Sequence, residues 1–332
     1  MDGITLVTGG AGFIGSHLVD ALLTEGADVR VLDDFSTGRE ENLDAAWRLA
    51  AVHGGGLQVI AGDVRDEVRM RDAVYGCDAV VHLAAVASVP RSVEDPVGCN
   101  SVTHGGTVNA LREAVDAGVP RFVLASSCAV YGDPAELPVA ETAPPEPLSP
   151  YAGAKLASEQ ACAGAADAGQ IAAVCLRFFN VYGPRQDPGS PYSGVISRFF
   201  AAAAAGEPAT LYGDGGQTRD FVYVADVVAA LRRALSRPPG GVSVLNVGSG
   251  RETSVAALLE QVEGVSGVHL APRREPAREG EVRRSCADAG RARWVLGWEA
   301  GTELADGLAA TWRWFRDGAA PVAPDPPRGL HG

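Results

Sequence analysis

The chain has 332 residues, of which 46% are hydrophobic and 21% are charged, and its formal net charge is −13. This composition is typical of a globular protein of one large or two modest domains and excludes a disordered chain. The acidic excess argues against nucleic acid or an anionic membrane surface as a partner, because such partners are bound by clustered Lys and Arg. Since no apolar run is long enough to span a membrane and no cationic leader opens the chain, we expect a cytoplasmic protein.

The cysteines do not have the spacing of metal ligands or of a disulfide framework. None of the six forms a CxxC pair, and no histidine stands near one of them at zinc-ligand spacing. We therefore expect no metal site and read the cysteines as small hydrophobic side chains.

Short apolar runs alternate with amphipathic stretches through the first half of the chain. Expected strands are 4–8, 28–32, 57–61, 79–83, 122–126 and 172–177, and expected helices include 17–24, 103–117 and 152–168. This alternation predicts an α/β fold of the Rossmann type, in which helices cover both faces of a doubly wound parallel sheet. Pro and Gly clusters after residue 180 predict a smaller, loop-rich α/β lobe, which the resemblance given below implies is the substrate lobe. We therefore divide the chain into 1–178, 179–317 and a flexible tail, 318–332, with about 218–250 returning to the first domain.

A glycine-rich turn, TGGAGFIG at 8–15, follows the first strand directly and opens the first helix. Glycines at 9, 12 and 15 permit a tight turn, a close approach to a pyrophosphate and close packing of helix on strand, while the helix N-terminus attracts phosphate. In this context the turn predicts a dinucleotide site.

Acidic residues after the second and third strands fit the same ligand. Asp33 and Asp34 end the second strand, where a carboxylate accepts hydrogen bonds from an adenosine ribose and repels a 2′-phosphate. That favours NAD over NADP, although the nearby Arg39 leaves the alternative open. Asp63 is placed to meet the adenine, and its alternative role is to cap a turn.

A Tyr and a Lys four residues apart predict a proton-transfer site. Tyr151 and Lys155 share one face of an expected helix, and Ser126 and Ser127 end the strand before it, at the edge of the sheet where ligands bind. An ammonium group and a positive nicotinamide ring would lower the pKa of the phenol, and a serine hydroxyl would share the substrate's proton.

With these motifs in order, the chain resembles the extended short-chain dehydrogenases/reductases that act on nucleotide sugars. The resemblance covers about residues 4–315 and rests on TGGAGFIG (8–15), LDDFSTG (32–38), GDVRD (62–66), HLAAVASVPRS (82–92), ASSCAVYGD (125–133), SPYAGAK (149–155), RFFNVYGPRQDP (177–188), YGDGGQTRDFVYVADV (212–227) and NVGSG (246–250). It implies bound NAD, Tyr151 as base, Lys155 on the ribose, and Ser127 as the assisting hydroxyl, with Ser126 as its rival.

The motifs and the resemblance together define the expected site. At the cofactor we expect Gly9, Gly12, Phe13, Ile14, Gly15, Asp33, Asp34, Ser36, Gly38, Asp63, Val64, Leu83, Ala84, Ala85, Ser126, Tyr151, Lys155 and Phe178. At the substrate we expect Ser88, Ser127, Asn180, Val195, Tyr212, Arg219, Arg278 and Ser285. In this resemblance Asn180 and the two arginines anchor the diphosphate, and Tyr212 stacks on the uracil.

The residues after Ser127 separate reactions within the family. Nucleotide-sugar 4,6-dehydratases carry an acid pair there, whereas this chain has Cys128 and Ala129. Without a carboxylate to protonate and deprotonate neighbouring carbons, removal and return of a hydride at one carbon remains, which is 4-epimerisation. Cys128 is either a buried small side chain or a proton donor of the kind found in the GDP-fucose synthases.

Substrate breadth also has a sequence signal. By resemblance, one position near 285 gates the sugar pocket, and the small Ser285 admits 2-acetamido sugars; residues 185–195 are similar to the matching segment of N-acetylhexosamine epimerases. We expect UDP-glucose and UDP-N-acetylglucosamine as substrates. A UDP-uronic acid remains an alternative, with Arg185 or Arg283 meeting its carboxylate.

Other readings of the chain are a 4,6-dehydratase, an epimerase of a dTDP-sugar, and a catalytically silent NAD-binding sensor on the same fold. Relatives dimerise through helices that correspond to 103–117 and 152–168, so a homodimer is expected.

Overall fold

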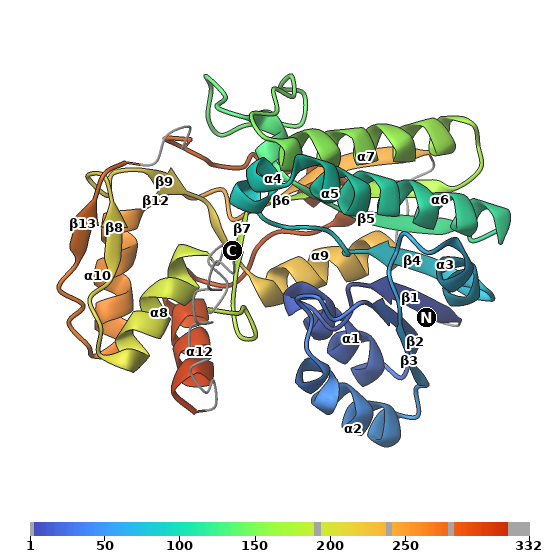
Figure 1. The fold of residues 1–332 in the computed structure, drawn as a ribbon, viewed down its shortest axis with the longest axis horizontal. Coiled ribbons are helices and arrows are strands. Elements are labelled where there is room, and N and C mark those ends of the chain that lie inside the picture. Colours follow the sequence, from blue (N-terminus) through green and yellow to red (C-terminus); the bar gives the residue numbers. More distant parts are fainter. Residues whose placement is uncertain (1–2, 189–193, 237–240, 278–281, 318–332) are drawn as a thin grey trace, which may run out of the picture.

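A seven-stranded sheet forms the centre of the first lobe, with six strands from residues 4–178 and a seventh from residues 242–247 (Figure 1). The computed structural model describes residues 3–188, 194–236, 241–277 and 282–317, and its large sheet has the order β11-β6-β5-β4-β1-β2-β3. The strands are β1 (Ile4–Thr8), β2 (Asp28–Asp33), β3 (Leu57–Ala61), β4 (Cys77–His82), β5 (Arg121–Ser127), β6 (Ala172–Phe178) and β11 (Val242–Val247). Neighbouring strands are parallel throughout. The expected doubly wound α/β class is confirmed.

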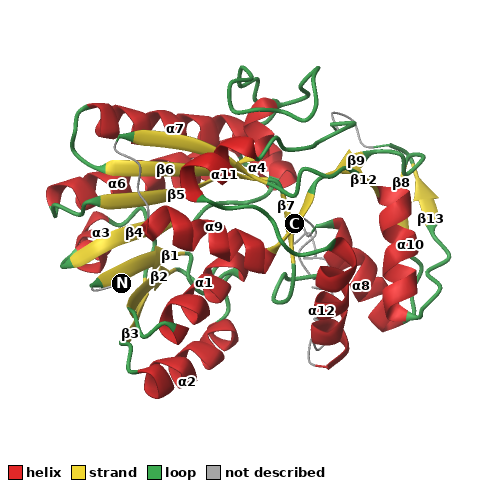
Figure 2. Cartoon of the chain, turned by 180° about the vertical axis from the view of Figure 1, so that it is seen from behind, coloured by secondary structure: helices red, strands yellow, loops and turns green. Residues whose placement is uncertain are grey.

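Helices cover both faces of this sheet because its strands are apolar on both faces. One face packs against α1 (Phe13–Thr24), α2 (Asp44–His53), α9 (Val224–Ser236) and α11 (Gly290–Leu296), the helices nearest the viewer in Figure 2. The other packs against α3 (Glu67–Val74), α6 (Gly106–Asp116) and α7 (Pro150–Asp167). Adjacent residues of a strand point to opposite faces, so Val7 packs in the core under α1 and α9, whereas Leu6 packs in the core under α3 and α6.

The strand order reverses direction at β1. From β1 the chain proceeds outward to β2 and β3 on one side and through β4 and β5 on the other. Ligands of open α/β sheets bind outside the carboxyl ends of the strands at such a switch point. The fold therefore places the glycine turn after β1 beside the residues that follow β4 and β5.

The second lobe has its own core of Phe, Leu and Val side chains between α8 (Val195–Ala205), α10 (Val255–Ser266) and α12 (Leu304–Asp317). Three small strand pairs join it, namely β7 (Asn180–Tyr182) with β10 (Phe221–Tyr223), β8 (Thr210–Tyr212) with β13 (Arg273–Glu275), and β9 (Thr218–Arg219) with β12 (Thr253–Ser254). Between these elements α9 and β11 lie in the first lobe, and so does α11. The proposed boundary at 178 stays a prediction, and residues 318–332 lie outside the described ranges.

The helices expected at 152–168 and 103–117 begin differently in the structure. Ser149 caps α7 by accepting a hydrogen bond from the Ala152 N–H at 3.2 Å, so the helix starts at Pro150 and not at 152. The expected helix at 103–117 is a π-helix, Ser101–Gly105, followed by α6, and it is preceded by the short α4 (Val89–Glu94) and α5 (Pro96–Asn100). Among the described residues, no helix is long and apolar enough to cross a membrane.

Candidate active site

The turn between β1 and α1 is close-packed in a way that only glycine allows. A Cβ on Gly15 would lie 2.1 Å from the carbonyl oxygen of Gly9, and one on Gly9 would lie 2.8 Å from the Ala84 nitrogen. Helix α1 starts after Gly12, which has no side chain to cap it, and no acidic residue occupies the first turn. The turn therefore presents backbone N–H groups and the positive end of a helix to an anion.

The Asp33 carboxylate lies against this turn. Its Oδ2 accepts a hydrogen bond from the Ala11 N–H at 2.9 Å, and burial raises its pKa. A Cβ on Gly38 would approach Asp33 Oδ1 to 2.8 Å, so the loop after β2 folds closely over the carboxylate. Next to it, the Ser36 hydroxyl donates to Asp34 Oδ1 at 2.6 Å.

Asp63, after β3, is engaged by its neighbour. The Arg65 N–H donates to Asp63 Oδ1 at 2.8 Å, the Arg65 guanidinium donates to Oδ2 at 2.5 Å, and this hydrogen bonding lowers the pKa of the carboxyl. That is the turn-capping role the sequence left open, and contact with adenine stays a prediction. Val64 is buried under α6, where Asn109 Nδ2 donates to its carbonyl oxygen at 2.8 Å.

The residues after β4 cross the end of β1. The Leu83 N–H donates to the Thr8 carbonyl at 3.1 Å, and the half-buried Ala84 and Ala85 follow. Thr8 Oγ1 lies 2.8 Å from Nδ1 of His82, a side chain that is 1% exposed and whose pKa is lowered by burial to about 3. His82 is therefore neutral at physiological pH.

The three predicted catalytic side chains meet between the end of β5 and the first turns of α7. The Tyr151 hydroxyl shares a hydrogen bond with the Ser127 side chain. Lys155 Nζ lies 5.9 Å from the centre of the Tyr151 ring and donates to the Ala125 carbonyl oxygen at 2.6 Å. The cluster brings together a phenol, a hydroxyl and an ammonium group at the edge of the sheet where ligands bind.

Ser126, which the sequence offered as a rival of Ser127, is directed away from Tyr151. Its hydroxyl donates to Glu159 Oε1 on α7 at 2.5 Å, and it is 3% exposed. Side chains alternate along a strand, so Ser127 faces the phenol and Ser126 does not. Phe178, the last residue of β6, pairs in register with Ser127 and is nearly buried.

Burial dominates the proton affinities of the cluster. It raises the pKa of Tyr151 to about 12, against the smaller opposite effect of the Ser127 hydrogen bond, and it lowers the pKa of Lys155 to about 8. The chain by itself therefore does not provide the lowered phenol pKa expected from the sequence. Lys155 is the only lysine in the sequence, because the rest of its 28 Lys and Arg residues are arginines.

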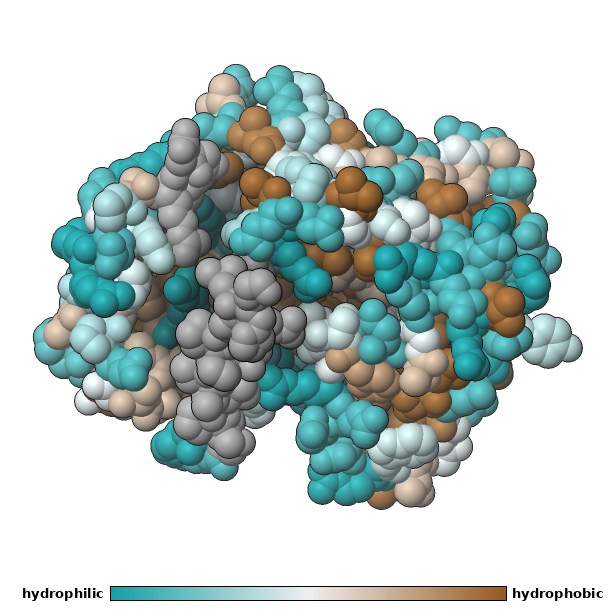
Figure 3. All heavy atoms as spheres, viewed as in Figure 1, coloured by the Kyte–Doolittle hydropathy of each residue, from teal (hydrophilic) through white to brown (hydrophobic). Residues whose placement is uncertain are grey.

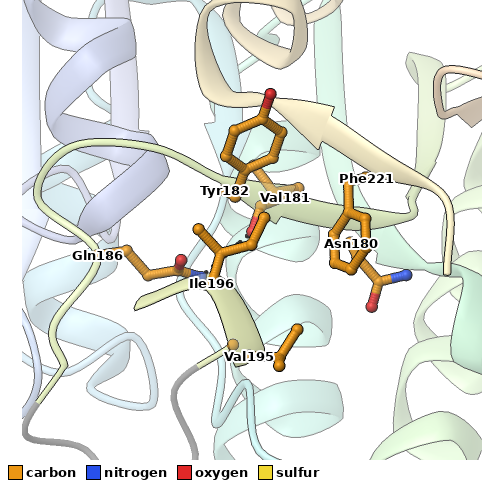
Figure 4. A pocket seen from close by; sticks show the side chains of 8 residues that line it. Asn180, Val181, Tyr182, Gln186, Val195, Ile196 and Phe221 are labelled. Carbon is orange, nitrogen blue, oxygen red and sulfur yellow. Dashed lines mark hydrogen bonds between the residues drawn. The ribbon is translucent and has the colours of Figure 1, made fainter. Parts of the chain in front are cut away.

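A pocket opens where β7 and β10 meet the start of α8 (Figure 4). Asn180, Val181, Tyr182, Gln186, Gly194, Val195, Ile196 and Phe221 line it. Gln186 lies on the side opposite Asn180 and Phe221, and its Nε2 donates to the Val181 carbonyl at 3.2 Å. Two expected substrate residues, Asn180 and Val195, are thus in one cavity.

Two further expected substrate residues lie next to the catalytic cluster. Cys128 follows Ser127 directly, hydrogen-bonds with the Ser285 side chain, and interacts electrostatically with Arg219. Burial raises the pKa of the Cys128 thiol to about 12, so it carries no charge near neutral pH. This juxtaposition brings β9 and residue 285 of the second lobe to the edge of the first.

Of the remaining expected substrate residues, the structure describes Tyr212 and Ser88. Tyr212 ends β8, in the strand pair with β13, and its carbonyl accepts a hydrogen bond from Gln217 Nε2 at 3.1 Å. The Ser88 hydroxyl caps α4 by accepting from the Arg91 N–H at 3.2 Å. Arg278 lies outside the described residues.

The two arginines considered for a uronic acid are already paired with carboxylates. Arg185 Nη2 lies 2.6 Å from Asp20 Oδ2, and Arg283 holds both oxygens of Asp214 at 2.9 Å. Neither guanidinium offers an uncompensated charge to a substrate carboxylate.

Three residues that the sequence reasoning missed contribute to the site. Glu159 and Arg177 form a buried ion pair under Ser126, and Asp220 accepts hydrogen bonds from the Ser249, Gly250 and Ala287 N–H groups next to Arg219. The sequence did carry a signal for two of them. Glu159 stands four residues after Lys155, on the helix face that Tyr151 and Lys155 share. Asp220 directly follows Arg219.

Comparison with known families agrees with this geometry. The model of the NAD dependent epimerase/dehydratase family matches residues 5–248. A protein named UDP-glucose 4-epimerase, from Mycolicibacterium smegmatis, is 42% identical over 315 residues, which cover 94% of this chain and 98% of that protein.

Solved structures are similar over the same length. The UDP-glucose 4-epimerase of Thermotoga maritima, crystallised with UDP-glucose, has a TM-score of 0.88 at 36% identity and covers 94% of this chain and 98% of its own. The UDP-N-acetylglucosamine 4-epimerase of Methanobrevibacter ruminantium, in complex with UDP-N-acetylmuramic acid, has a TM-score of 0.88 at 32% identity, with 95% and 98% covered.

Proposed function

The chain belongs to the NAD dependent epimerase/dehydratase family, and we propose that it is the member that inverts C4 of a UDP-hexose or UDP-N-acetylhexosamine through a 4-keto sugar. It is an NAD-dependent isomerase of the UDP-sugar 4-epimerase group. The observation that carries the proposal is the cluster of Ser127, Tyr151 and Lys155. In the sequence Ser127 is followed by Cys128 and Ala129, so no carboxylate stands at these two positions.

The residues at the β1–α1 turn fit NAD. Side chains at Gly9 or Gly15 would collide with the backbone of Ala84 or of Gly9, so only glycine lets the turn pack this closely, and the uncapped α1 N-terminus favours the charge of a pyrophosphate. Asp33 and Asp34 would hold the adenosine ribose. Arg39, which left NADP open, lies 2.9 Å from Asp187 in an ion pair, so it is not an uncompensated cation for a 2′-phosphate.

The chemistry that NAD supplies when bound is reversible acceptance of a hydride at C4, together with a positive ring charge that favours the phenolate of Tyr151. Tyr151 removes the proton from O4 of the sugar and returns it after the sugar has turned. The Ser127 hydroxyl shares that proton, because it already hydrogen-bonds to the phenol. Lys155, held by the Ala125 carbonyl, supplies a positive charge next to the ring.

Epimerisation requires that the diphosphate stay fixed while the sugar presents its other face. We assign this anchoring to Asn180, Arg219 and Arg278, with Tyr212 stacking on the uracil. An electrostatic interaction between Arg219 and Cys128, the residue after Ser127, supports an anchor on the side of the second lobe that faces the cluster. Charge-assisted hydrogen bonds of this kind contribute about 1.5–3 kcal/mol each.

The small Ser285 supports acceptance of both UDP-glucose and UDP-N-acetylglucosamine. Its side chain contacts Cys128, beside the cluster, so a bulky residue there would occupy the space of a 2-acetamido group. The pairing of Arg185 and Arg283 with carboxylates disfavours a uronic acid. The neutral Cys128 thiol, with its raised pKa, disfavours acid-base chemistry at neighbouring carbons.

We also infer a homodimer through α6 and α7, which lie side by side on one face of the sheet (Figure 1). Val108 of α6 and Val97 of α5 are 42% and 79% exposed. Figure 3 shows apolar side chains interspersed with polar ones over this region.

The test is to incubate the purified protein with UDP-glucose and, separately, with UDP-N-acetylglucosamine, and to follow the sugar protons by NMR. The proposal predicts the C4 epimer in both reactions, and it predicts that Tyr151→Phe lowers kcat by about 1000-fold or more while the folded protein keeps its NAD. A 4-keto-6-deoxy product would identify a dehydratase. Turnover of dTDP-glucose but not of the UDP-sugars would show that the enzyme selects thymine and not uracil as the nucleotide base. Absence of turnover of any nucleotide sugar would favour the silent sensor.

A further inference from the structure

Three consecutive residues at the end of β5 contact three residues on one face of α7. Lys155 Nζ donates to the Ala125 carbonyl at 2.6 Å, and the Ser126 hydroxyl donates to Glu159 Oε1 at 2.5 Å. The third contact is the hydrogen bond between the side chains of residues 127 and 151. The helix residues stand at i, i+4 and i+8, so the strand end is attached to two full turns of the helix.

Arg177 extends this attachment to the other side of Ser127. On β6, Arg177 donates from Nε and Nη2 to the two oxygens of Glu159 at 2.9 and 2.7 Å, and each residue is 4% exposed. The Arg177 guanidinium also lies 4.7 Å from the centre of the Tyr131 ring. Tyr131 ends the 3-10 helix Cys128–Tyr131, whose first residue follows Ser127. The ion pair therefore holds the chain both before and after Ser127.

Stability alone does not account for this arrangement. Two buried charges cost a large desolvation energy, and replacing such a pair by apolar side chains of similar size is often neutral or stabilising. What a bidentate Arg–carboxylate pair does provide is a fixed geometry, because both groups are planar and have defined hydrogen-bond directions.

We propose that the buried Glu159–Arg177 ion pair is a positioning device that holds Ser127 and Lys155 in register with Tyr151 and keeps a negative charge next to the Lys155 ammonium. The proposal rests on the proposed function for the roles of Ser127, Tyr151 and Lys155. Glu159 and Arg177 touch no reacting atom in it and act through their neighbours.

The surroundings of Lys155 agree with the electrostatic part. Burial lowers its pKa, whereas Cys99 of α5, Glu159 of α7 and Cys175 of β6 act in the opposite direction. His82 of β4 interacts with the Lys155 charge and is itself neutral at physiological pH because its pKa is lowered to about 3. Thiols are weak partners when protonated, so the Glu159 carboxylate is the group whose loss should affect Lys155 most.

The single lysine makes this measurable without substrate. Protein labelled with ¹³C,¹⁵N-lysine gives one side-chain ammonium signal, and its titration is that of Lys155. In Glu159→Gln the amide still accepts a hydrogen bond from Ser126 but carries no charge. We expect the titration midpoint of Lys155 to fall by about one pH unit. We also expect kcat to be about 10-fold or more lower, with the pH profile of kcat displaced in the same direction as the Lys155 midpoint.

Glu113→Gln is the matched control. Glu113 is 3% exposed and forms ion pairs with Arg71 and Arg112 at 3.1 and 3.0 Å, but it lies on α6 and touches none of the cluster. This variant should lose stability and leave both the Lys155 titration and kcat at their wild-type values. An unchanged Lys155 midpoint in folded Glu159→Gln, or a lowered midpoint with wild-type kcat, would overturn the proposal.

A second variant covers the case in which Glu159→Gln does not fold. Ser126→Ala removes only the hydroxyl that ties β5 to Glu159 and leaves the ion pair intact, and we expect kcat to fall about 10-fold with KM unchanged. Wild-type kcat in this variant would contradict the positioning role. Because the lysine titration needs no turnover, failure of the proposed epimerase activity and failure of this inference give different results.

Discussion

Asp20 of α1 and Arg185 of the segment after β7 form an ion pair with an Nη2 to Oδ2 distance of 2.6 Å. It joins the helix that starts at the glycine turn to the chain entering the second lobe, and His17 Nε2 lies 3.0 Å from the neighbouring Pro184 carbonyl oxygen. The two charged side chains are only 18% and 19% exposed. Asp20→Ala should lower the free energy of unfolding by about 1–3 kcal/mol, because it leaves a partly buried guanidinium without its carboxylate.

A double-mutant cycle in urea checks this coupling. Arg185→Ala should cost a similar amount, and the double variant should cost clearly less than the sum of the two single variants. Strict additivity would show that the ion pair is not coupled in solution.

The lowered pKa of Lys155 should make the stability of the protein rise with pH in the alkaline range. The pKa of Lys155 falls from the ordinary value of 10.5 to about 8 in the folded protein. Between these values the unfolded chain binds more protons than the folded one, so stability should rise with pH in this window. Relative to Lys155→Met, which has no such group, the wild type should gain up to about 3 kcal/mol between pH 7.5 and 10.5.

Thermal or urea unfolding of both proteins across this range provides the measurement. The comparison cancels the other groups that titrate there, so parallel curves for the two proteins would refute the lowered lysine pKa.

Gly15 is predicted to tolerate no side chain. In Gly15→Ala the new Cβ would meet the Gly9 carbonyl oxygen, which belongs to the backbone and cannot turn aside, so we expect a loss of about 1–3 kcal/mol in stability and loss of most bound NAD. Gly264→Ala on α10 is the control, because nothing lies within 4 Å of its added Cβ and α10 is not part of the inferred dimer contact, and it should gain about 0.5–1 kcal/mol. The unfolding free energy and the cofactor absorbance of the purified proteins measure both effects. Normal NAD content in Gly15→Ala would contradict the assigned cofactor position.

Ser285 is predicted to set sugar selectivity. Ser285→Tyr should lower kcat/KM for UDP-N-acetylglucosamine by about 10-fold or more relative to UDP-glucose, because the ring fills space beside Cys128 that the acetamido group needs. Ser285→Ala should leave the ratio unchanged. Equal losses for both substrates in Ser285→Tyr would place the gate elsewhere.

The elements that a local pattern encodes were predictable from the sequence, and long-range pairings were not. Apolar runs located β1 to β6, and motif order indicated the cluster of Ser127, Tyr151 and Lys155. The choice between Ser126 and Ser127 depended on which face of β5 each occupies at the strand's end, which the sequence did not reveal. Arg185 is separated from Asp20 by 165 residues, so no local pattern could show that its charge is already compensated.

The phenol pKa is a second instance of the same limit. The expected lowering of the phenol pKa combined the Lys155 ammonium with a bound nicotinamide ring, whereas in the protein alone burial of the hydroxyl raises the pKa of Tyr151. Desolvation depends on every element that covers a group, and spacing along one helix does not report it.

The most direct test of the account uses UDP-glucose that carries deuterium at C4 of the sugar. Inversion at C4 by removal and return of the same hydride within one site predicts that the C4 epimer forms with its deuterium retained, as read by NMR of the product. Loss of the deuterium to solvent, or a product unchanged at C4, would contradict it.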